Sequence, residues 1–478
     1  MSVNLAAWKS NVLPLTIALF GAALTASLFY TPLVLVALIG VPAALYFSSR
    51  PYELLLFMVF LIPFNFVFTV GSVPIAAELL KVFLWIPFII HLANNKLPFN
   101  TSRYNKWLAV WGGILILSVF RSNNVPLTIK ESVRIGSNLG LCYLVLNLVD
   151  SREKLFQVFR VLTVSTFLVA CYGFYQWAIQ DFGALFWIIN PRLDTGLAPG
   201  REVFWLWRSR IISTLTSEME LGHYFNLCLP PAIVLWLVES RGRLNSRWLL
   251  AALAILAGLL LTFTFASWLA LIATTAFFVL LMDRKRRWQF LIAGAIVFSL
   301  ITAILVFGPL RDFFLAKALA SGNAGLAFDI MGRLDSSVFA LQTWWSHPWI
   351  GVGVGSYQLL EYSHEYVHSA WGPSGSTPHE AYLYMLAISG IIGTVSMLRV
   401  LVGSIRSNLR LRTNSEWGPV AMALAFAITT AMLASFADDS TLFGPHAGYV
   451  LWLLVGLGES VRRLITNPTR VGILSRQA

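Results

Sequence analysis

Charged residues are scarce in this chain of 478 residues, because only 12% are Asp, Glu, Lys or Arg while 57% are hydrophobic. Soluble domains carry about 25% charged residues, so this composition excludes an ordinary soluble enzyme. The apolar runs recur from end to end at the length of a transmembrane helix, which is longer than a barrel strand. The expected fold is all-α, a polytopic transmembrane bundle of about 12–14 spans with two long extracytoplasmic loops.

A secreted, disulfide-bonded protein is also excluded. The only cysteines, Cys142, Cys171 and Cys228, all lie in apolar runs. They are therefore assigned to the core rather than to a disulfide framework or a metal site. The apolar segment 12–29, preceded only by Lys9, has the length of a signal peptide. Similar segments follow it along the whole chain and need no separate targeting device, so we expect it to remain as a span.

The basic residues are placed unevenly along the chain. The formal net charge is +12, which in a soluble protein would suggest a nucleic-acid partner. Here the short loops on one side of the apolar runs hold most of the Lys and Arg residues, from Lys9 to Arg476. The positive-inside rule places this side, with both termini, in the cytoplasm. We expect a multi-pass protein of the cell inner membrane with no nucleic-acid partner.

The apolar pattern divides the chain into five parts. Residues 1–180 and 218–307 are expected to form the N-terminal and central transmembrane helices, and 380–478 the C-terminal helices with a cytoplasmic tail. An Arg- and Trp-rich loop at 181–217 and a larger loop at 308–379 are expected outside the cytoplasm. Long loops are usually functional or disordered, and the aromatic content of these two argues against disorder. Their aromatic side chains form either a belt at the headgroup level or a platform for sugar rings.

Most basic residues expected outside the cytoplasm are arginines, whose planar charged fork matches phosphate oxygens. Arg201, Arg208 and Arg210 come just before a span and are positioned to meet a phosphate at the headgroup plane. The alternative is that they snorkel or pair with nearby carboxylates. The external arginines are Arg121, Arg134, Arg192, Arg201, Arg208, Arg210, Arg311 and Arg333.

A polar, glycine-rich segment at 346–357 interrupts the apolar pattern. Non-helical backbone at membrane depth is tolerated only where protein buries it or where it lines a water-filled cavity, so this segment is a candidate site. Gly351, Gly353 and Gly355 indicate a tight backbone path that is able to present amides to an anion. His347 precedes a proline and is more typical of a turn residue.

His379 lies between Pro378 and Glu380, directly before an apolar run. Imidazole titrates near neutral pH, so this side chain is suited to accept a proton from an attacking hydroxyl at the membrane surface. The alternative is a hydrogen-bonded structural histidine.

Two other functional classes remain as alternatives. His364-Glu365-Tyr366-Val367-His368 matches the zinc-protease signature H-E-x-x-H, which would make the protein a membrane metalloprotease. Its Ser-, Gly- and Pro-containing surroundings are a poor setting for a helix, and an obvious third ligand is lacking. A transporter is expected to carry charges in mid-span and internal repeats, and neither is evident in this sequence.

The combined motifs resemble the O-antigen ligase and O-antigen polymerase superfamily. They are Arg210-Ile-Ile-Ser-Thr-Leu, Arg333, the run from Trp344 to Tyr357, and His379-Glu380 with Gly390. The resemblance covers residues 205–400. Family members typically carry a Ser-Arg-Gly-Ala-Trp-type turn between two central spans. Here Thr264-Phe265-Ala266-Ser267-Trp268 stands at that place, with Phe265 where the arginine would be.

The resemblance implies an inverting glycosyltransferase that moves a glycan from undecaprenyl diphosphate to an acceptor hydroxyl on the periplasmic face. It is most similar to an O-antigen ligase with a lipid A core acceptor; the alternative is a polymerase of O-antigen or exopolysaccharide. The expected partners are these glycans and membrane lipids. No cofactor or metal is expected, because arginines neutralise phosphate charge. The expected catalytic residues are His379 and Arg210. The expected substrate-binding residues are Arg333, Arg208, Arg201, Glu380, His347, Gly353 and Tyr357.

Overall fold

The computed structural model of the protein describes most of the chain from Arg50 to Thr466. The described residues are 50–64, 69–70, 73–74, 84–86, 88–90, 92–93, 99–122, 124–179, 202–203, 208–215, 217–281, 336–357 and 380–466. Apart from two antiparallel hairpins, β1–β2 (Thr69–Val70 and Val73–Pro74) and β3–β4 (Glu202–Val203 and Arg208–Ser209), the elements in these ranges are helices. The expected all-α fold is confirmed.

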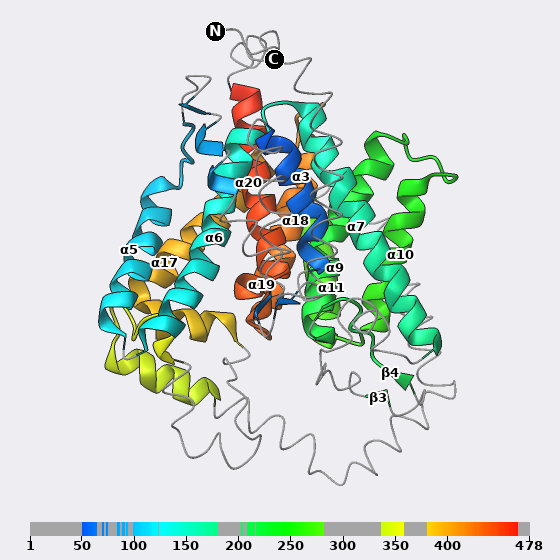
Figure 1. Cartoon of the computed structure of the whole chain (residues 1–478). Coiled ribbons are helices and arrows are strands. Elements are labelled where there is room, and N and C mark those ends of the chain that lie inside the picture. Colours follow the sequence, from blue (N-terminus) through cyan, green and yellow to red (C-terminus); the bar gives the residue numbers. More distant parts are fainter. Residues whose placement is uncertain are drawn as a thin grey trace, which may run out of the picture.

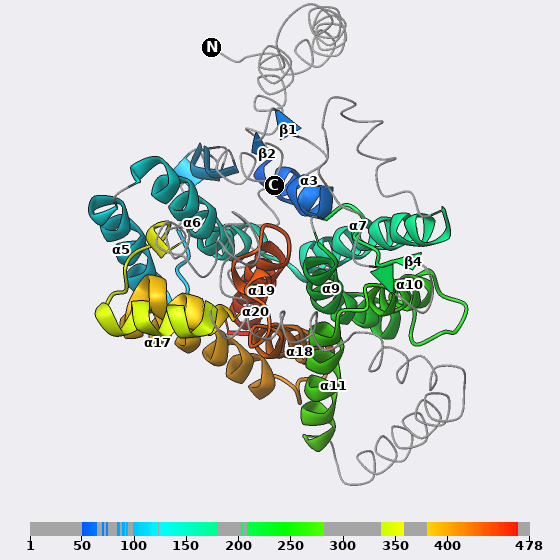
Figure 2. The same cartoon turned by 90° about the horizontal axis from the view of Figure 1, so that it is seen from below.

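The helices surround a central pair, α18 and α20, in both views of the bundle (Figures 1 and 2). On one side lie α5, α6 and α17, and on the other α7, α9, α10 and α11. The helix bounds are α3 Pro51–Leu61 with the 3-10 turn η1 Ile62–Phe64, α5 Asn105–Arg121, α6 Val125–Leu148, α7 Arg152–Ile179, α9 Glu218–Val238, α10 Arg247–Leu261, α11 Phe265–Leu280, a helix at 336–346, α17 Ala381–Arg410, α18 Gly418–Ala434, α19 Ser440–Phe443 and α20 Ala447–Thr466.

Three described helices are long and apolar enough to cross a membrane: α7, α9 and α17, with mean hydropathy of 1.6, 1.5 and 2.0. Pro51–Phe64, α10, α11 and α18 are apolar but shorter. This confirms a helical membrane protein. The central transmembrane helices were expected to begin at residue 218, and α9 begins there, where the Ser217 hydroxyl accepts a hydrogen bond from the Glu220 amide at 3.1 Å.

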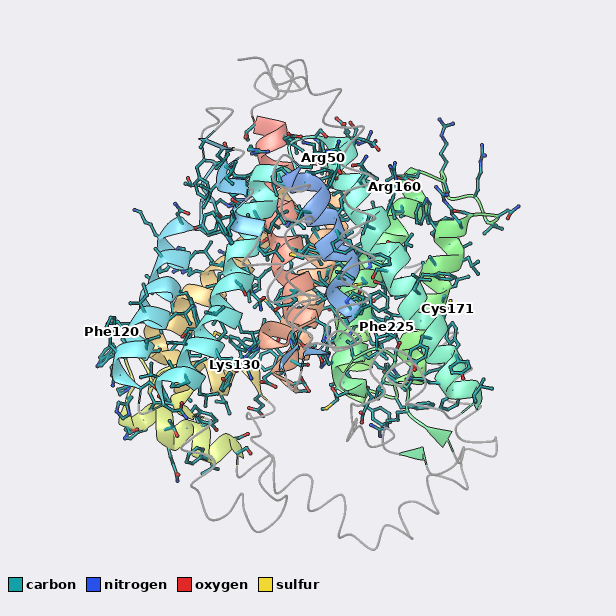
Figure 3. The ribbon with its side chains drawn as sticks, in the orientation of Figure 1. Arg50, Phe120, Lys130, Arg160, Cys171 and Phe225 are labelled. Carbon is teal, nitrogen blue, oxygen red and sulfur yellow. The ribbon has the colours of Figure 1, made fainter. Side chains whose placement is uncertain are left out.

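Close helix packing in the centre depends on small residues. A Cβ on Gly456 of α20 would lie 2.9 Å from Cβ of Val145 and 3.0 Å from the carbonyl oxygen of Cys142, both on α6. Glycine therefore lets the backbones of α20 and α6 approach, as is typical of helices packed in a membrane. Cys142 and Cys228 are buried as expected, whereas Cys171 is exposed on the outer face of α7 (Figure 3). Its assignment to the core was wrong, because α7 presents that face away from the neighbouring helices.

The two ends of the bundle differ in their polar contacts. Arg50 and Arg160 lie toward one end and Lys130 toward the other (Figure 3). At the first end, Arg160 on α7 pairs with Glu153 at 2.9 Å and with Glu239, just past α9, at 2.8 Å. The N-termini of α9 and α17 lie at the second end, which we call the site end.

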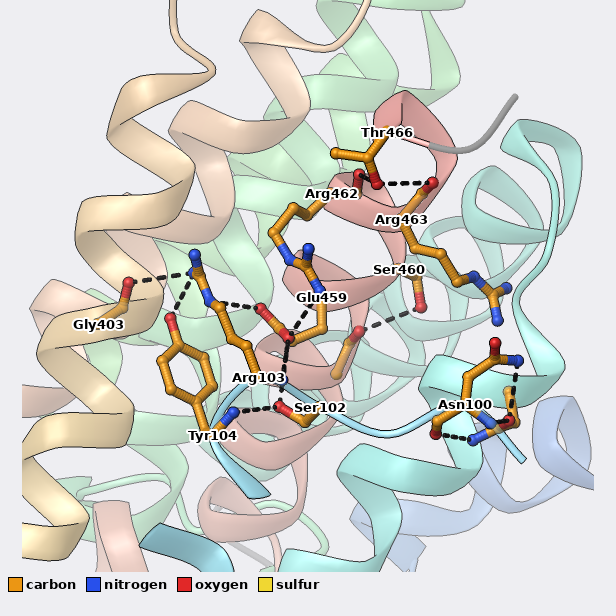
Figure 4. Close-up of polar contacts among 12 residues, drawn as sticks. Asn100, Ser102, Arg103, Tyr104, Gly403, Glu459, Ser460, Arg462, Arg463 and Thr466 are labelled. Carbon is orange, nitrogen blue, oxygen red and sulfur yellow. Dashed lines mark hydrogen bonds and ion pairs between the residues drawn. The ribbon is translucent and has the colours of Figure 1, made fainter. Parts of the chain in front are cut away.

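A buried carboxylate ties the segment before α5 to α20 at the end opposite the site (Figure 4). Glu459 is 1% exposed and accepts hydrogen bonds from the Ser102 hydroxyl and from the Arg103 amide, both at 3.2 Å. It also pairs with the Arg103 guanidinium at 3.1 Å and with Arg462 at 3.5 Å. Burial raises the pKa of the neighbouring Tyr104 phenol to about 12, so it stays protonated and accepts a hydrogen bond from Arg103.

Candidate active site

Helix α17 is broken at Gly390, and the glycine-rich segment fills the break. In a continuous helix the amides of Ile391 and Ile392 would donate to the carbonyls of Ala387 and Ile388. Instead the backbone of residues 348–353 supplies a partner to each of these four groups. The bonds run from Ile391 to Pro348 (2.9 Å), from Ile392 to Trp349 (3.2 Å), from Val352 to Ala387 (2.9 Å) and from Gly353 to Ile388 (3.1 Å). The break therefore leaves these four groups satisfied in the interior.

Two glycines make this insertion possible. Gly390 has φ 62° and ψ −169°, a conformation open essentially to glycine alone. A Cβ there would lie 2.3 Å from the carbonyl carbon of Trp349, and one on Gly351 would lie 2.4 Å from that of Ile388. The tight backbone path expected from the glycines is confirmed. The amide of Gly353 donates to the carbonyl of Ile388, so in the structure this N–H is engaged in a backbone hydrogen bond.

The glycine-rich segment 346–357, which we call the inserted segment, and the tryptophan just before it carry both exposed and buried side chains. His347 is exposed, with its Nδ1 2.9 Å from the Ser346 hydroxyl. Trp345 and Trp349 are 78% and 68% exposed. Tyr357 is buried, with its ring centroid 5.6 Å from that of Tyr384 on α17. Tyr357 thus packs the segment against α17, while its role toward substrate stays a prediction, as does that of His347.

Arg210 reaches the site end from the strand β4 side. Its Nη1 lies 3.5 Å from Oε1 of Glu218 on the first turn of α9, and its side chain is 23% exposed. The following residues are buried and anchored to α7: the Ser213 amide donates to Oε1 of Gln176 at 2.7 Å, and Gln176 Nε2 donates back to the Ser213 carbonyl at 3.1 Å. A partly buried guanidinium on an anchored segment is the arrangement expected of a preorganised anion ligand, and for Arg210 this role stays a prediction.

A buried polar network lies next to this arginine and was not anticipated from the sequence. The ring Nδ1 and the backbone amide of His446 both point at Oε1 of Glu220, at 2.7 and 3.2 Å. One turn further along α9, Nδ1 of His223 lies 2.9 Å from the Ser267 hydroxyl, and its Nε2 lies 3.9 Å from Oδ1 of Asp438. The signal was present in the polar run Glu218-Met-Glu-Leu-Gly-His223, since ionisable residues in a span mark functional sites.

Phe265 opens α11 and faces outward. It is 58% exposed, and its ring centroid lies 5.4 Å from that of Trp268. At the place where the resemblance expects an arginine, the structure therefore puts an apolar ring on the outer surface. The residue of this turn that points into the bundle is Ser267, which is buried beside His223.

Part of the expected site lies outside the described residues. This holds for His379, Arg333, Arg201, the side chain of Arg208 and the His364–His368 motif. Glu380 is described as the residue preceding α17, and it is partly buried. Within the described ranges no cluster of three His, Cys, Asp or Glu side chains suits a metal ion.

The fold and the broken helix define a polytopic helical membrane protein with its polar site at one end of the bundle. Residues 250–398 match the family described as O-antigen ligase. The matched range includes most of α10, all of α11 and the inserted segment, and the first part of α17. The match supports the resemblance to the O-antigen ligase and polymerase superfamily that the sequence motifs indicated. The match supports a membrane glycosyltransferase of the ligase or polymerase kind. No curated protein matches the chain.

Proposed function

We propose that this protein is a metal-independent, inverting glycosyltransferase that transfers a glycan from undecaprenyl diphosphate to an acceptor hydroxyl on the periplasmic face of the inner membrane. The match to the O-antigen ligase family over the inserted segment and α17 carries this proposal. The half-buried Arg210 beside the start of α9 supports an anionic donor at the site end.

In the proposed reaction the acceptor oxygen attacks the anomeric carbon while the bond from that carbon to the diphosphate oxygen breaks. The diphosphate leaves with the bonding electron pair, and Arg210 stabilises the growing negative charge. His379 accepts the proton of the attacking hydroxyl. Direct displacement inverts the anomeric centre.

The acceptor separates two versions of this proposal. The matched family is described as O-antigen ligase, which favours a lipid A core acceptor. The second candidate is a polymerase, whose acceptor is another lipid-linked repeat. Both use the same donor chemistry, and the acceptor decides between them.

The test is the surface-glycan profile of the native host carrying wild-type protein, His379→Ala or Arg210→Ala, resolved by chain length. Loss of long glycan from the core lipid, with accumulation on the carrier, identifies a ligase. Collapse of the ladder to single repeats identifies a polymerase. Arg399→Ala is the matched control, because this arginine contacts Trp107 on the outer helices away from the site end. An unchanged profile in both site variants contradicts the proposal, provided that all variants accumulate equally in the membrane.

Divalent metal removal gives an independent check of the mechanism. We expect the transfer rate of the purified protein to be the same with and without EDTA, since arginine supplies the positive charge at the diphosphate. Loss of activity on chelation, restored by Zn²⁺, would favour the metalloprotease-type motif at 364–368 instead.

A further inference from the structure

A short segment between α18 and α20 contacts both halves of the candidate site. We call residues 435–446 the linking segment. It begins at Ser435, includes α19, and ends at His446, directly before α20. Figure 2 shows α19 near the middle of the site end, between α17 on one side and α9 on the other.

The first end of the linking segment is bonded to the start of α17. The carbonyl of Ser435 accepts the amide of Ala381 at 3.0 Å. Next to this bond, the Tyr382 hydroxyl donates to the carbonyl of Met432 at 2.6 Å, and the Tyr382 ring packs on Phe436 with centroids 4.6 Å apart. These contacts fix the residues that follow His379 in the chain.

The other end of the linking segment is bonded to the start of α9. His446 directs its backbone amide and its ring Nδ1 to the same oxygen of Glu220. Glu220 lies two residues beyond Glu218, the partner of Arg210. In the middle, Asp438 accepts the amide of Ser440 at 2.7 Å and faces His223.

We propose that the linking segment positions the Arg210 side and the α17 side of the site relative to each other, and that the His446–Glu220 contact is the joint that sets this spacing. The effect on rate rests on the proposed glycosyl transfer, whereas the structural role does not. His446 and Glu220 are positioning residues, because they act through the first turn of α9.

Burial makes this joint rigid. The Glu220 and His446 side chains are 3% and 0% exposed, so water does not replace either partner at low cost. Removing the imidazole takes away the partner that lies 2.7 Å from Oε1 of the buried Glu220, and we expect the first turn of α9 to shift in response. A displacement of about 1 Å at a reacting centre costs about 100-fold in rate.

The test compares His446→Ala with His446→Asn in the purified full-length protein in lipid nanodiscs. The amide nitrogen of asparagine takes the place of Nδ1 as a donor to Glu220. Ser460→Ala is the matched control, since this buried hydroxyl lies on the same helix α20 but bonds Gly456 and Val145 away from the site.

The first readout is hydrogen–deuterium exchange without substrate. In His446→Ala we expect exchange to rise about tenfold in peptides covering 210–222 and 380–390, while a peptide covering 99–110 is unchanged. His446→Asn and Ser460→Ala are expected to match wild type. The second readout is the transfer rate, expected to fall by about 10- to 100-fold in His446→Ala at nearly constant KM, and to recover in His446→Asn.

Each outcome decides a separate point. Raised exchange in His446→Ala, with recovery in His446→Asn, supports the joint even if no glycan transfer is found, in which case the proposed function fails alone. Wild-type exchange in His446→Ala overturns the inference. If His446→Ala does not accumulate, His446→Leu replaces it: leucine keeps side-chain bulk but has no donor for Glu220, so raised exchange is expected and wild-type exchange overturns the inference. Glu220→Gln keeps an acceptor oxygen for His446, so wild-type-like exchange and rate are expected. Equal losses in Glu220→Gln and His446→Asn overturn the positioning role, because charge rather than geometry then matters.

Discussion

Replacing Gly390 by alanine tests the broken helix directly. Alanine at φ 62° and ψ −169° costs about 1–3 kcal/mol in backbone strain alone. The new methyl group would also lie 2.3 Å from the carbonyl carbon of Trp349, so the inserted segment must shift. That shift weakens the four bonds between 348–353 and 387–392, each worth about 1 kcal/mol. We therefore expect Gly390→Ala to destabilise the protein by about 3–5 kcal/mol.

The assay is the thermal unfolding temperature of the purified protein in nanodiscs, with exchange at residues 347–355 as a local probe. Gly112→Ala is the matched control, because Gly112 lies within α5 and a Cβ there meets no atom within 4 Å. This control is expected to be neutral or to stabilise the protein by up to about 1 kcal/mol. If Gly390→Ala unfolds at the wild-type temperature and leaves exchange at 347–355 unchanged, the inserted segment does not depend on the break.

Two further substitutions probe other parts of the bundle. Phe265→Arg is expected to leave the unfolding temperature and the transfer rate near those of wild type, because this exposed position faces outward; a large gain in rate would show that the position reaches the donor. Arg103→Ala is expected to destabilise the protein by about 1–3 kcal/mol, because the buried Glu459 loses its ion pair with Arg103 at 3.1 Å. Arg103→Lys is expected to recover part of this loss of stability. Equal unfolding temperatures for wild type and Arg103→Ala would contradict that account.

Local sequence signals predicted the start of a helix more accurately where a capping residue directly precedes an apolar run than where charged residues separate the two. Ser217 and the run after it give the start of α9 directly. Helix α6, in the part expected to form N-terminal transmembrane helices, begins at Val125, where the Asn124 side chain accepts a hydrogen bond from the Leu127 amide. The charged residues in the first turns of α6 did not suggest a transmembrane helix. In the structure Arg134 and Glu131 form an ion pair with each other within the helix.

The site was less predictable because its contacts join distant parts of the chain. The glycines at 351–355 indicated an irregular backbone, but not that its partner would be a break in α17 about forty residues later. His446 and Glu220 are 226 residues apart, and neither forms a local motif with its neighbours. Motif resemblance found Arg210 and the inserted segment, whereas the polar joint between α9 and the linking segment required the fold.

The buried carboxylates of the bundle have basic neighbours. Among the described residues, the buried Asp and Glu side chains are Glu131, Glu220, Asp438 and Glu459. Glu131 pairs with Arg134 at 2.5 Å and Glu459 with Arg103 at 3.1 Å, while Glu220 lies 2.7 Å from His446. The interior therefore holds these acids as paired groups rather than as isolated charges, and each pair ties the carboxylate to a second side chain whose position it fixes.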